Sequence, residues 1–308
     1  MLKMANWKLG PGFVELIAEQ RSESWFNARK CRVTASKYAS LLGLSSFETP
    51  LESIGTILGT IEQKAPNAAM QLGTEKEDVV RKRYCEQYGA TAVEPSLCIG
   101  LIWYDIMCSW DENKLLSSKY KSMLEDPEHP NWFIAGSPDG FLTYGNGQMA
   151  NMEIKFPKKM YNTLVQKTLG TFYSKYRYHA YDHPILCKPF RQRIHKSGIT
   201  SDTGAADNYP HIFTSHLFQM QGCMALTQQT RCAYVVGSLD RGMYDEIVLF
   251  DEDLWKYYLY PELIRVIETE IKPRMTVSQK EIFRKSVNEI IAMAPRDSEK
   301  CIPFVHPT

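Results

Sequence analysis

Residues 135–156 constrain the fold most strongly, because this segment reads as a β-hairpin. A Gly-Asn-Gly tripeptide at 145–147 separates two strand-like runs, and these residue types readily adopt the positive φ that hairpin turns need. On the second run Glu153 and Lys155 lie two residues apart, so their side chains project from the same face. The apolar residues between and beside them project from the other face.

The register of this hairpin decides which side chains meet. A three-residue loop or a bulge centred on Asn146 places Asp139 directly opposite Glu153, and facing residues of an antiparallel pair share a side. A two-residue loop would instead place Asp139 opposite apolar Ile154. We predict the first register, which unites Asp139, Glu153 and Lys155 in one polar cluster. Two carboxylates converging beside a lysine form an arrangement that suits a divalent metal.

Length and composition describe a globular chain with a sizeable core. The 308 residues suffice for one large domain or two small ones, and 44% hydrophobic with 23% charged residues is ordinary for a soluble protein. No apolar run approaches a membrane span, and no signal-peptide core begins the chain. The eight cysteines are scattered without any Cys-x-x-Cys, which argues against a disulfide framework and against zinc or iron–sulfur sites. We therefore expect an intracellular protein of the nucleus or cytoplasm that is neither secreted nor membrane-bound.

The segment that follows the hairpin is strongly basic. Residues 154–200 contain ten Lys or Arg, Lys158 and Lys159 among them, against the single acid Asp182, together with eight Phe or Tyr. Basic residues interleaved with aromatics suit a phosphate backbone with exposed bases. The alternative is a solvated surface excursion whose aromatics pack into the core. Because the segment directly follows the carboxylate hairpin, we favour nucleic-acid binding.

Two earlier segments offer further candidate residues. Thr34 or Ser36 can cap a helix over 37–42, and a hydroxyl at a helix start with Arg29 and Arg32 upstream could hold a phosphate. On its own this pattern is more often only a cap. Residues 73–89 form a predicted helix that begins with a Thr74–Glu77 capping box, so a structural role is the favoured interpretation of Glu77 on a lone helix.

The order of the remaining elements predicts an α/β sandwich around a small mixed sheet. Helices are expected over 13–20, 50–59, 212–227, 251–271 and 280–293, and strands over 96–104, 132–135, 232–239 and 244–250, with a polar loop or helical insertion over 111–130.

Together these residues resemble the PD-(D/E)xK nuclease superfamily, and within it the lambda-exonuclease or YqaJ-like viral recombinase branch. The core motif resembles Ser137-Pro138-Asp139-Gly140 followed by Glu153-Ile154-Lys155. Strings of this kind are common, but further short motifs occur in family order. They are Trp25 with Arg29, Thr34-Ala35-Ser36, Gly73 with Glu77, and Gln219 with Gln221. Without these motifs, Asp139 would read as a turn residue and Glu153 with Lys155 as a surface pair.

The resemblance implies the restriction-endonuclease-like fold, a central mixed β-sheet flanked by helices. It spans about residues 20–270 of a single nuclease domain, 1–308, that closes with a helix and an irregular tail over 271–308. The run from Glu77 to Asp139 and the run from Lys155 to Gln219 are longer than in the compact phage enzymes. These insertions, about 108–131 and 160–210, leave the oligomeric state and the shape of a substrate channel open.

Asp139, Glu153 and the Ile154 carbonyl can supply hard oxygen ligands for one or two Mg²⁺ ions, with Mn²⁺ as a substitute, and Glu77 can contribute to a second ion. Lys155 is then expected to orient the attacking water and to stabilise the developing charge. The resemblance assigns Arg29 and Ser36 to the phosphate at a 5′ end and places Gln221 near the metal site. Further phosphate and DNA contacts are expected from Thr34, Lys158 and Lys159. For Trp25 packing against the phosphate-binding segment is favoured over contact with DNA, and Arg32 is a candidate by charge and position only.

The resulting hypothesis is a metal-dependent exonuclease that digests linear duplex DNA from a 5′ end during recombination, repair or viral genome processing. An endonuclease or an RNA-cleaving nuclease of the same fold is one alternative. A nucleic-acid-binding recombination protein without catalysis is another, and the presence of Asp139, Glu153 and Lys155 together argues against it. A single-strand annealing protein as partner stays open, as does the choice between a monomer and a ring-like homo-oligomer.

Overall fold

A computed structural model describes residues 6–10, 12–45, 47–62, 65–101, 118–156, 212, 214–237 and 243–294 of the chain. The strands are β1 (Trp7–Gly10), β2 (Phe13–Leu16), β3 (Val33–Thr34), β4 (Ala90–Val93), β5 (Cys98–Gly100), β6 (Ile134–Ala135), β7 (Gly140–Tyr144), β8 (Met149–Lys155), β9 (Arg231–Gly237) and β10 (Met243–Leu249). The longer helices are α1 (Glu23–Arg29), α3 (Pro50–Leu58), α4 (Ala68–Tyr88), α6 (Ser118–Glu125), α10 (Thr214–Thr227), α12 (Tyr260–Val266) and α13 (Val277–Met293).

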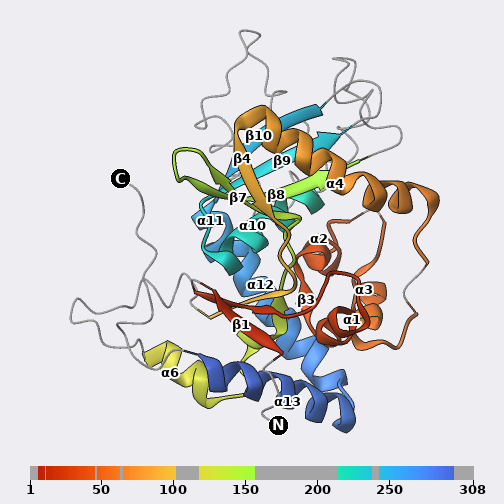
Figure 1. The fold of residues 1–308 in the computed structure, drawn as a ribbon. Helices are drawn as coiled ribbons and strands as arrows, with labels where there is room; N and C mark the ends of the chain where they lie inside the picture. Colours follow the sequence, from red (N-terminus) through yellow and green to blue (C-terminus); the bar gives the residue numbers. More distant parts are fainter. Residues whose placement is uncertain are drawn as a thin grey trace.

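The central layer is a five-stranded sheet in the order β10-β9-β8-β7-β4 (Figure 1). Strands β8 and β9 run parallel, while the other neighbours are antiparallel. Helix α4 covers one face and α10 the other. The prediction of a mixed sheet flanked by helices is therefore confirmed.

The alternation of side chains along β8 and β9 explains how both faces are filled. On one face Val80 and Tyr84 of α4 pack in a cluster with Met152 and Ile154 of β8. On the other face Met220 and Met224 of α10 pack against alternate residues of β9. Odd-numbered residues of β8 therefore point to the α10 side, and Glu153 is buried there with 1% of its surface exposed.

The hairpin has the predicted register. Gly140 pairs with Met152, and the pairing extends to the turn, where the Tyr144 N–H donates to the Gln148 carbonyl at 2.9 Å. The loop has three residues, and Gly147 within it takes φ +81°, a conformation that favours glycine. Asp139 consequently aligns with Glu153, as the sequence predicted.

Residues 13–20 are not helical, contrary to the prediction. Phe13–Leu16 form strand β2, which lies between β1 and β5 in a separate three-stranded sheet. All four residues are buried, so the apolar run fills a strand with both faces covered rather than one stripe of a helix. Within this strand the Glu15 carboxylate accepts the Ser96 N–H at 2.9 Å and pairs with Lys8 at 3.1 Å.

The predicted start of the α4 helix is also wrong. The helix begins at Ala68, where the Asn67 side chain accepts the Met70 N–H at 3.0 Å. Thr74 and Glu77 therefore lie inside the helix and form no capping box. Because Glu77 is not needed as a cap, its carboxylate is available for the contacts described below.

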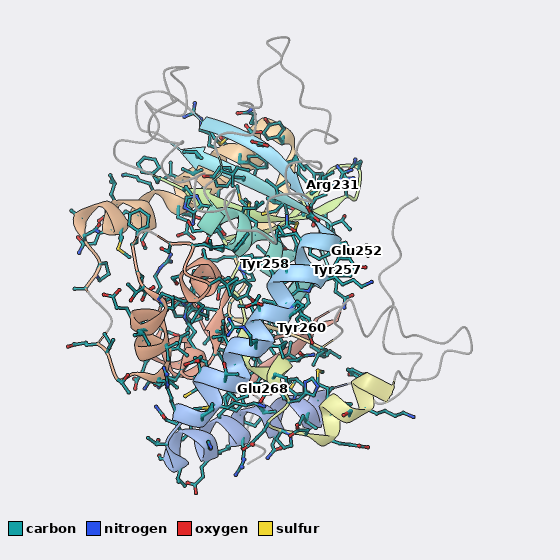
Figure 2. The ribbon with its side chains drawn as sticks, turned by 180° about the vertical axis from the view of Figure 1, so that it is seen from behind. Arg231, Glu252, Tyr257, Tyr258, Tyr260 and Glu268 are labelled. Carbon is teal, nitrogen blue, oxygen red and sulfur yellow. The ribbon has the colours of Figure 1, made fainter. Side chains whose placement is uncertain are left out.

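The C-terminal part follows the prediction closely. Asp251 caps the next helix by accepting the Leu254 N–H at 2.9 Å. The helical segment then continues without a break through α11 (Glu252–Leu254), η3 (Trp255–Leu259), α12, η4 (Ile267–Ile271) and η5 (Lys272–Arg274). Figure 2 shows this segment crossing the back of the molecule diagonally from Glu252 to Glu268. Helix α13 begins with a Thr276–Gln279 capping box, three residues earlier than predicted.

Several other expectations are confirmed, and a few lie outside the described residues. The structure contains the predicted helices as α3 and α10, the predicted strand pair as β9 and β10, and a helical insertion as α6. Most of the basic segment, with Lys158 and Lys159, falls outside the described residues. Within the described part of the chain, no helix is both long and apolar enough to cross a membrane.

Candidate active site

Asp139 lies where the chain enters β7, at the edge of the hairpin. Its N–H donates to the Met152 carbonyl at 3.0 Å, and its Oδ2 accepts the Ile154 N–H at 2.7 Å. The Ile154 N–H thus donates to the Asp139 carboxylate instead of to a backbone carbonyl of β7. These two hydrogen bonds fix Asp139 beside the C-terminal half of β8.

Glu153 and Lys155 form an ion pair on β8, on the face that α10 covers. Lys155 Nζ donates to Glu153 Oε1, and Gln219 Nε2 of α10 donates to the other oxygen, Oε2, at 2.8 Å. Both oxygens of Glu153 are therefore held in place. Lys155 keeps 24% of its side chain exposed, against 2% for Glu153, so the ion pair is more open to solvent on the Lys155 side.

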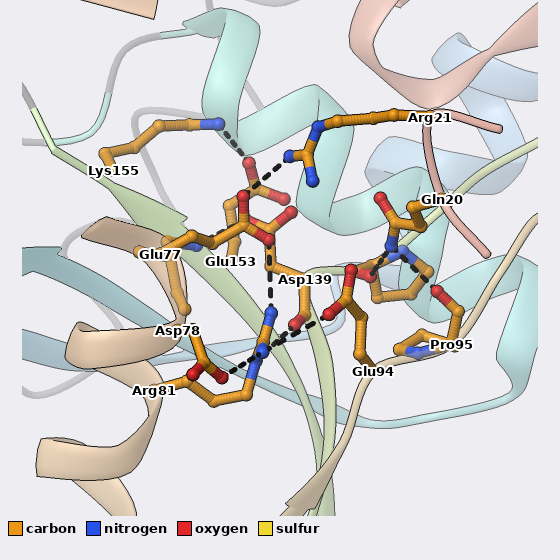
Figure 3. Close-up of polar contacts among 12 residues, drawn as sticks. Gln20, Arg21, Glu77, Asp78, Arg81, Glu94, Pro95, Asp139, Glu153 and Lys155 are labelled. Carbon is orange, nitrogen blue, oxygen red and sulfur yellow. Dashed lines mark hydrogen bonds and ion pairs between the residues drawn. The ribbon is translucent and has the colours of Figure 1, made fainter. Parts of the chain in front are cut away.

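Glu77 approaches the same cluster from α4 and is held by two arginines (Figure 3). Arg21 Nη2 donates to Glu77 Oε2 at 2.7 Å, and Arg81 Nη2 donates to Oε1 at 3.1 Å. Arg81 also donates through Nε to the Asp139 carbonyl at 2.9 Å. Arg81 therefore ties α4 to the residue that opens the hairpin, while Arg21 brings a second positive charge to the carboxylates.

The Asp139 and Glu153 carboxyl groups resist ionisation. Burial raises the pKa of Asp139 well above its usual range, and the charges of Glu153 and Glu77 raise it further. Burial also raises the pKa of Glu153, although Lys155 opposes the effect. For Lys155, burial acts to lower the pKa, but Glu153 and Asp139 outweigh it and the pKa is raised. Such a site gains stability from any cation that binds between the carboxylates.

A second polar cluster lies at the start of α2 (Tyr38–Leu41) and holds three of the predicted phosphate-binding residues. Arg29 Nη2 donates to Thr34 Oγ1 at 3.2 Å, and Ser36 Oγ lies 3.4 Å from the same oxygen. Neither hydroxyl caps the helical turn that follows, so the capping interpretation is wrong. Burial, and second the charge of Arg21, lower the pKa of Arg29 to about 10. A partly desolvated guanidinium beside two hydroxyls is a good anion site.

Trp25 packs under this cluster, as the sequence favoured. Its ring lies 4.0 Å from the Arg29 guanidinium carbon, and its Nε1 donates to Ser137 Oγ at 3.2 Å. The side chain is buried. Trp25 therefore orients Arg29 and connects α1 to the segment that leads into Asp139.

The two clusters are neighbours in space. Strands β3 and β6 pair in parallel, with Thr34 beside Ala135. The approach is close, because a Cβ added to Gly136 would lie 3.4 Å from the Ala35 Cβ. The segment that carries Thr34 and Ser36 therefore runs directly alongside the segment that leads to Asp139.

Arg32 does not contribute to this site, contrary to the prediction. Its side chain is buried, and its nitrogens donate to the carbonyls of Ala28 and Trp132, at 2.6 and 3.3 Å, and to Ser286 Oγ at 3.1 Å. The guanidinium carbon also lies 4.9 Å from the Phe283 ring. Arg32 thus joins α1 to α13. Its side chain lies in the core and makes no hydrogen bond to Thr34 or Ser36.

The placement of Gln221 beside the metal site is wrong as well. Its Nε2 donates to the Leu249 carbonyl at 2.9 Å, and its Oε1 accepts the Asp251 N–H at 2.7 Å. The two glutamines are two residues apart on a helix, so they face different ways. Gln219 faces Glu153, whereas Gln221 satisfies the backbone between β10 and the next helix.

A matched pair of substitutions separates these roles. Gln221→Ala should lower the free energy of unfolding by about 2 kcal/mol, because it leaves two backbone groups without their partner. Gln219→Ala should lower it by less, because Lys155 still pairs with Glu153 and the Glu153 carboxyl can take up a proton, and it should digest DNA about tenfold more slowly, because Glu153 loses its anchor. Urea titration and a duplex-digestion assay measure both effects. Normal stability with lost digestion in Gln221→Ala would restore the original placement.

The donor set of the site can be compared with the needs of a divalent metal ion. Among the described residues, no three His, Cys, Asp or Glu side chains are grouped so that they could hold a metal ion by themselves. The site instead offers two carboxylates, Asp139 and Glu153, together with backbone oxygen. Such a set suits Mg²⁺, which commonly binds through one or two carboxylates and completes its coordination with water and substrate phosphate.

Two residues of this site were missed from the sequence. Arg81 follows Glu77 by four residues on the same helix, a spacing that signals an ion pair and could have revealed it. Arg21 has no such signal, because its partner Glu77 lies 56 positions away.

The sheet, its flanking helices and the Asp139–Glu153–Lys155 hairpin place the chain in the class of PD-(D/E)xK nucleases that its motifs resemble. The model of the YqaJ-like viral recombinase domain matches residues 24–181, and the chain belongs to that family.

Solved structures that are similar to this chain include two of LHK-Exo. One is LHK-Exo in complex with dAMP, with 21% identity, coverage of 86% of this chain and 98% of that chain, and a TM-score of 0.47. The other is the alkaline exonuclease LHK-Exo from Laribacter hongkongensis, with 20% identity, the same coverage and a TM-score of 0.45. A comparison with curated proteins found no match.

Proposed function

We propose that this protein is a metal-dependent exodeoxyribonuclease that digests linear duplex DNA from a 5′ end during recombination. The observation that carries the proposal is the adjacency of the two clusters across the β3–β6 pair. One cluster suits a terminal phosphate and the other suits phosphodiester hydrolysis. An enzyme that holds a chain end beside its reactive groups cuts close to that end, so the arrangement favours exonuclease activity.

Mg²⁺, with Mn²⁺ as a substitute, is the proposed metal. Asp139 and Glu153 would hold it together with the Ile154 carbonyl. In a strand, the N–H and C=O of one residue point to the same side, and the Ile154 N–H points to Asp139 rather than to β9. Its carbonyl therefore faces the edge where β7 has ended. The ion would polarise the phosphate and lower the pKa of a bound water.

The protein side chains have separate tasks in this proposal. Lys155 orients the attacking water and stabilises the developing negative charge, since its ammonium group pairs with Glu153 and its side chain is partly exposed. Gln219 keeps Glu153 in position. Arg29, Thr34 and Ser36 hold the terminal phosphate and so set which phosphodiester reaches the site. Glu77 remains a proposed additional metal ligand.

One assay tests the proposed function. The protein is incubated with 5′-phosphorylated linear duplex, 5′-hydroxyl duplex, covalently closed circular DNA, and RNA, each with Mg²⁺, Mn²⁺ or EDTA. We expect Mg²⁺-dependent release of nucleotides from the linear duplexes, faster for the phosphorylated one, and intact circles and RNA. Cleavage of the circle would identify an endonuclease, and loss of RNA would identify a ribonuclease. If DNA binds without any metal-dependent product, the chain is a binding protein and the proposal fails.

A further inference from the structure

Arg21 occupies a backbone conformation that is unfavourable for its side chain. Its φ is +65°, in the left-handed region that glycine adopts at no steric cost and that a Cβ disfavours. The residue lies directly before Ser22, the N-cap of α1. Strained positions of this kind persist where the surrounding structure holds them, and they occur often at functional sites.

The contacts of Arg21 do not explain why an arginine is needed there. Among the described residues its only polar partner is Glu77, reached by one nitrogen at 2.7 Å. Glu77 already pairs with Arg81, whose side chain is only 8% exposed and lies inside the protein. Arg21 itself is 43% exposed. Arg81 is shared with Asp78 and Glu94, at 3.1 and 3.4 Å, so Arg21 supplies part of the positive charge beside Glu77. Only one nitrogen of Arg21 is used for this contact, and most of its donors stay available for an incoming group.

The guanidinium of Arg21 lies beside the carboxylate cluster. Figure 3 shows it pointing at the carboxylates of Glu77, Glu153 and Asp139. It is also close enough to Arg29 for its positive charge to lower the pKa of that residue. Two cations that repel each other across a solvent-accessible site are brought to lower energy by an anion between them.

We propose that Arg21 binds the phosphodiester at the scissile position, next to the terminal phosphate held by Arg29. The planar guanidinium exchanges Glu77 for the phosphate oxygens when DNA enters, because charge-assisted paired hydrogen bonds to phosphate suit arginine. This exchange releases Glu77 Oε2 towards the reaction site. The inference rests on the proposed function and adds a substrate-binding residue to it.

Arg21→Gly tests the inference without harming the fold, because glycine fits the positive φ. We expect a thermal midpoint equal to or higher than that of the parent. In EDTA, where no cleavage occurs, affinity for 5′-phosphorylated duplex should fall about tenfold, with a salt dependence shallower by about one ion. In Mg²⁺, kcat should fall about 10²-fold with the preference for a 5′-phosphate retained. Arg21→Lys should recover part of the affinity.

Arg284→Ala is the matched control, since Arg284 is a half-exposed arginine of α13 that also pairs with one glutamate, Glu128. It should leave each of these measurements unchanged. Parental affinity and turnover in Arg21→Gly would overturn the inference, and so would a lower thermal midpoint, which would give Arg21 a structural role. If the parent binds DNA without digesting it, the nuclease proposal fails while the EDTA affinities still decide the role of Arg21. If the parent binds no DNA, both fail.

Discussion

Lys155→Met should eliminate DNA digestion, with a loss of turnover on the order of 10³-fold, and leave DNA binding in EDTA intact. The substitution removes the ammonium group that pairs with Glu153 and keeps the apolar stem of the side chain. The fold should survive for two reasons. Gln219 still holds Glu153, and the Glu153 carboxyl, whose pKa burial already raises, can take up a proton instead of remaining an unpaired buried charge.

Single-turnover digestion of labelled duplex measures the chemical step separately from binding, and circular dichroism on heating confirms cooperative unfolding. Lys285→Met is the control, because Lys285 is an exposed lysine of α13, outside the site. It should digest DNA at the parental rate. Turnover in Lys155→Met within tenfold of the parent would show that the water is oriented elsewhere and that the hairpin is not the catalytic element.

The central part of this site was predictable because the sequence patterns that determine it involve only neighbouring residues. The Gly-Asn-Gly turn and the alternation along β8 fixed the register that aligns Asp139 with Glu153, and they depend only on neighbouring residues. Motif order then indicated the family, and the match to the YqaJ-like domain confirms it. The packing partners of an element depend on the tertiary structure, and the wrong predictions were those that depended on packing.

The errors share one physical cause. Phe13–Leu16 carry an apolar run short enough for a buried strand or a helix, and the choice depends on β1 and β5, the second of which lies far along the chain. Gln219 and Gln221 differ only in direction around α10, and only the structure shows which one faces β8. Arg29 and Arg32 likewise lie three positions apart, yet Arg29 joins the polar cluster of Thr34 and Ser36, and Arg32 is buried in the core.

Arg32→Met should lower the free energy of unfolding by about 3 kcal/mol and leave DNA affinity unchanged, the reverse of what a phosphate-binding role requires. The guanidinium is buried without a carboxylate partner among the described residues, and its pKa, lowered by burial to about 10, keeps it charged at neutral pH. Its three hydrogen bonds join α1, the Trp132 carbonyl and α13, and hydrogen bonds from a charged donor contribute about 1.5–3 kcal/mol each before desolvation is subtracted. Methionine keeps the contact with Phe283 but leaves the Trp132 carbonyl unpaired.

Urea unfolding measures the stability of this variant, and duplex affinity in EDTA is measured well below the unfolding transition. Lys30→Met is the control, because Lys30 is an exposed lysine of the same segment and loses the same charge. It should keep parental stability, and its affinity for DNA measures how much one positive charge near α1 contributes to DNA binding. Weakened binding with unchanged stability in Arg32→Met would place this residue at the DNA after all. The expected result would show that one short segment carries both a site residue and a core residue. Arg29 belongs to the anion site and Arg32 to the core, because the chain turns between them at Cys31, where φ is +62°.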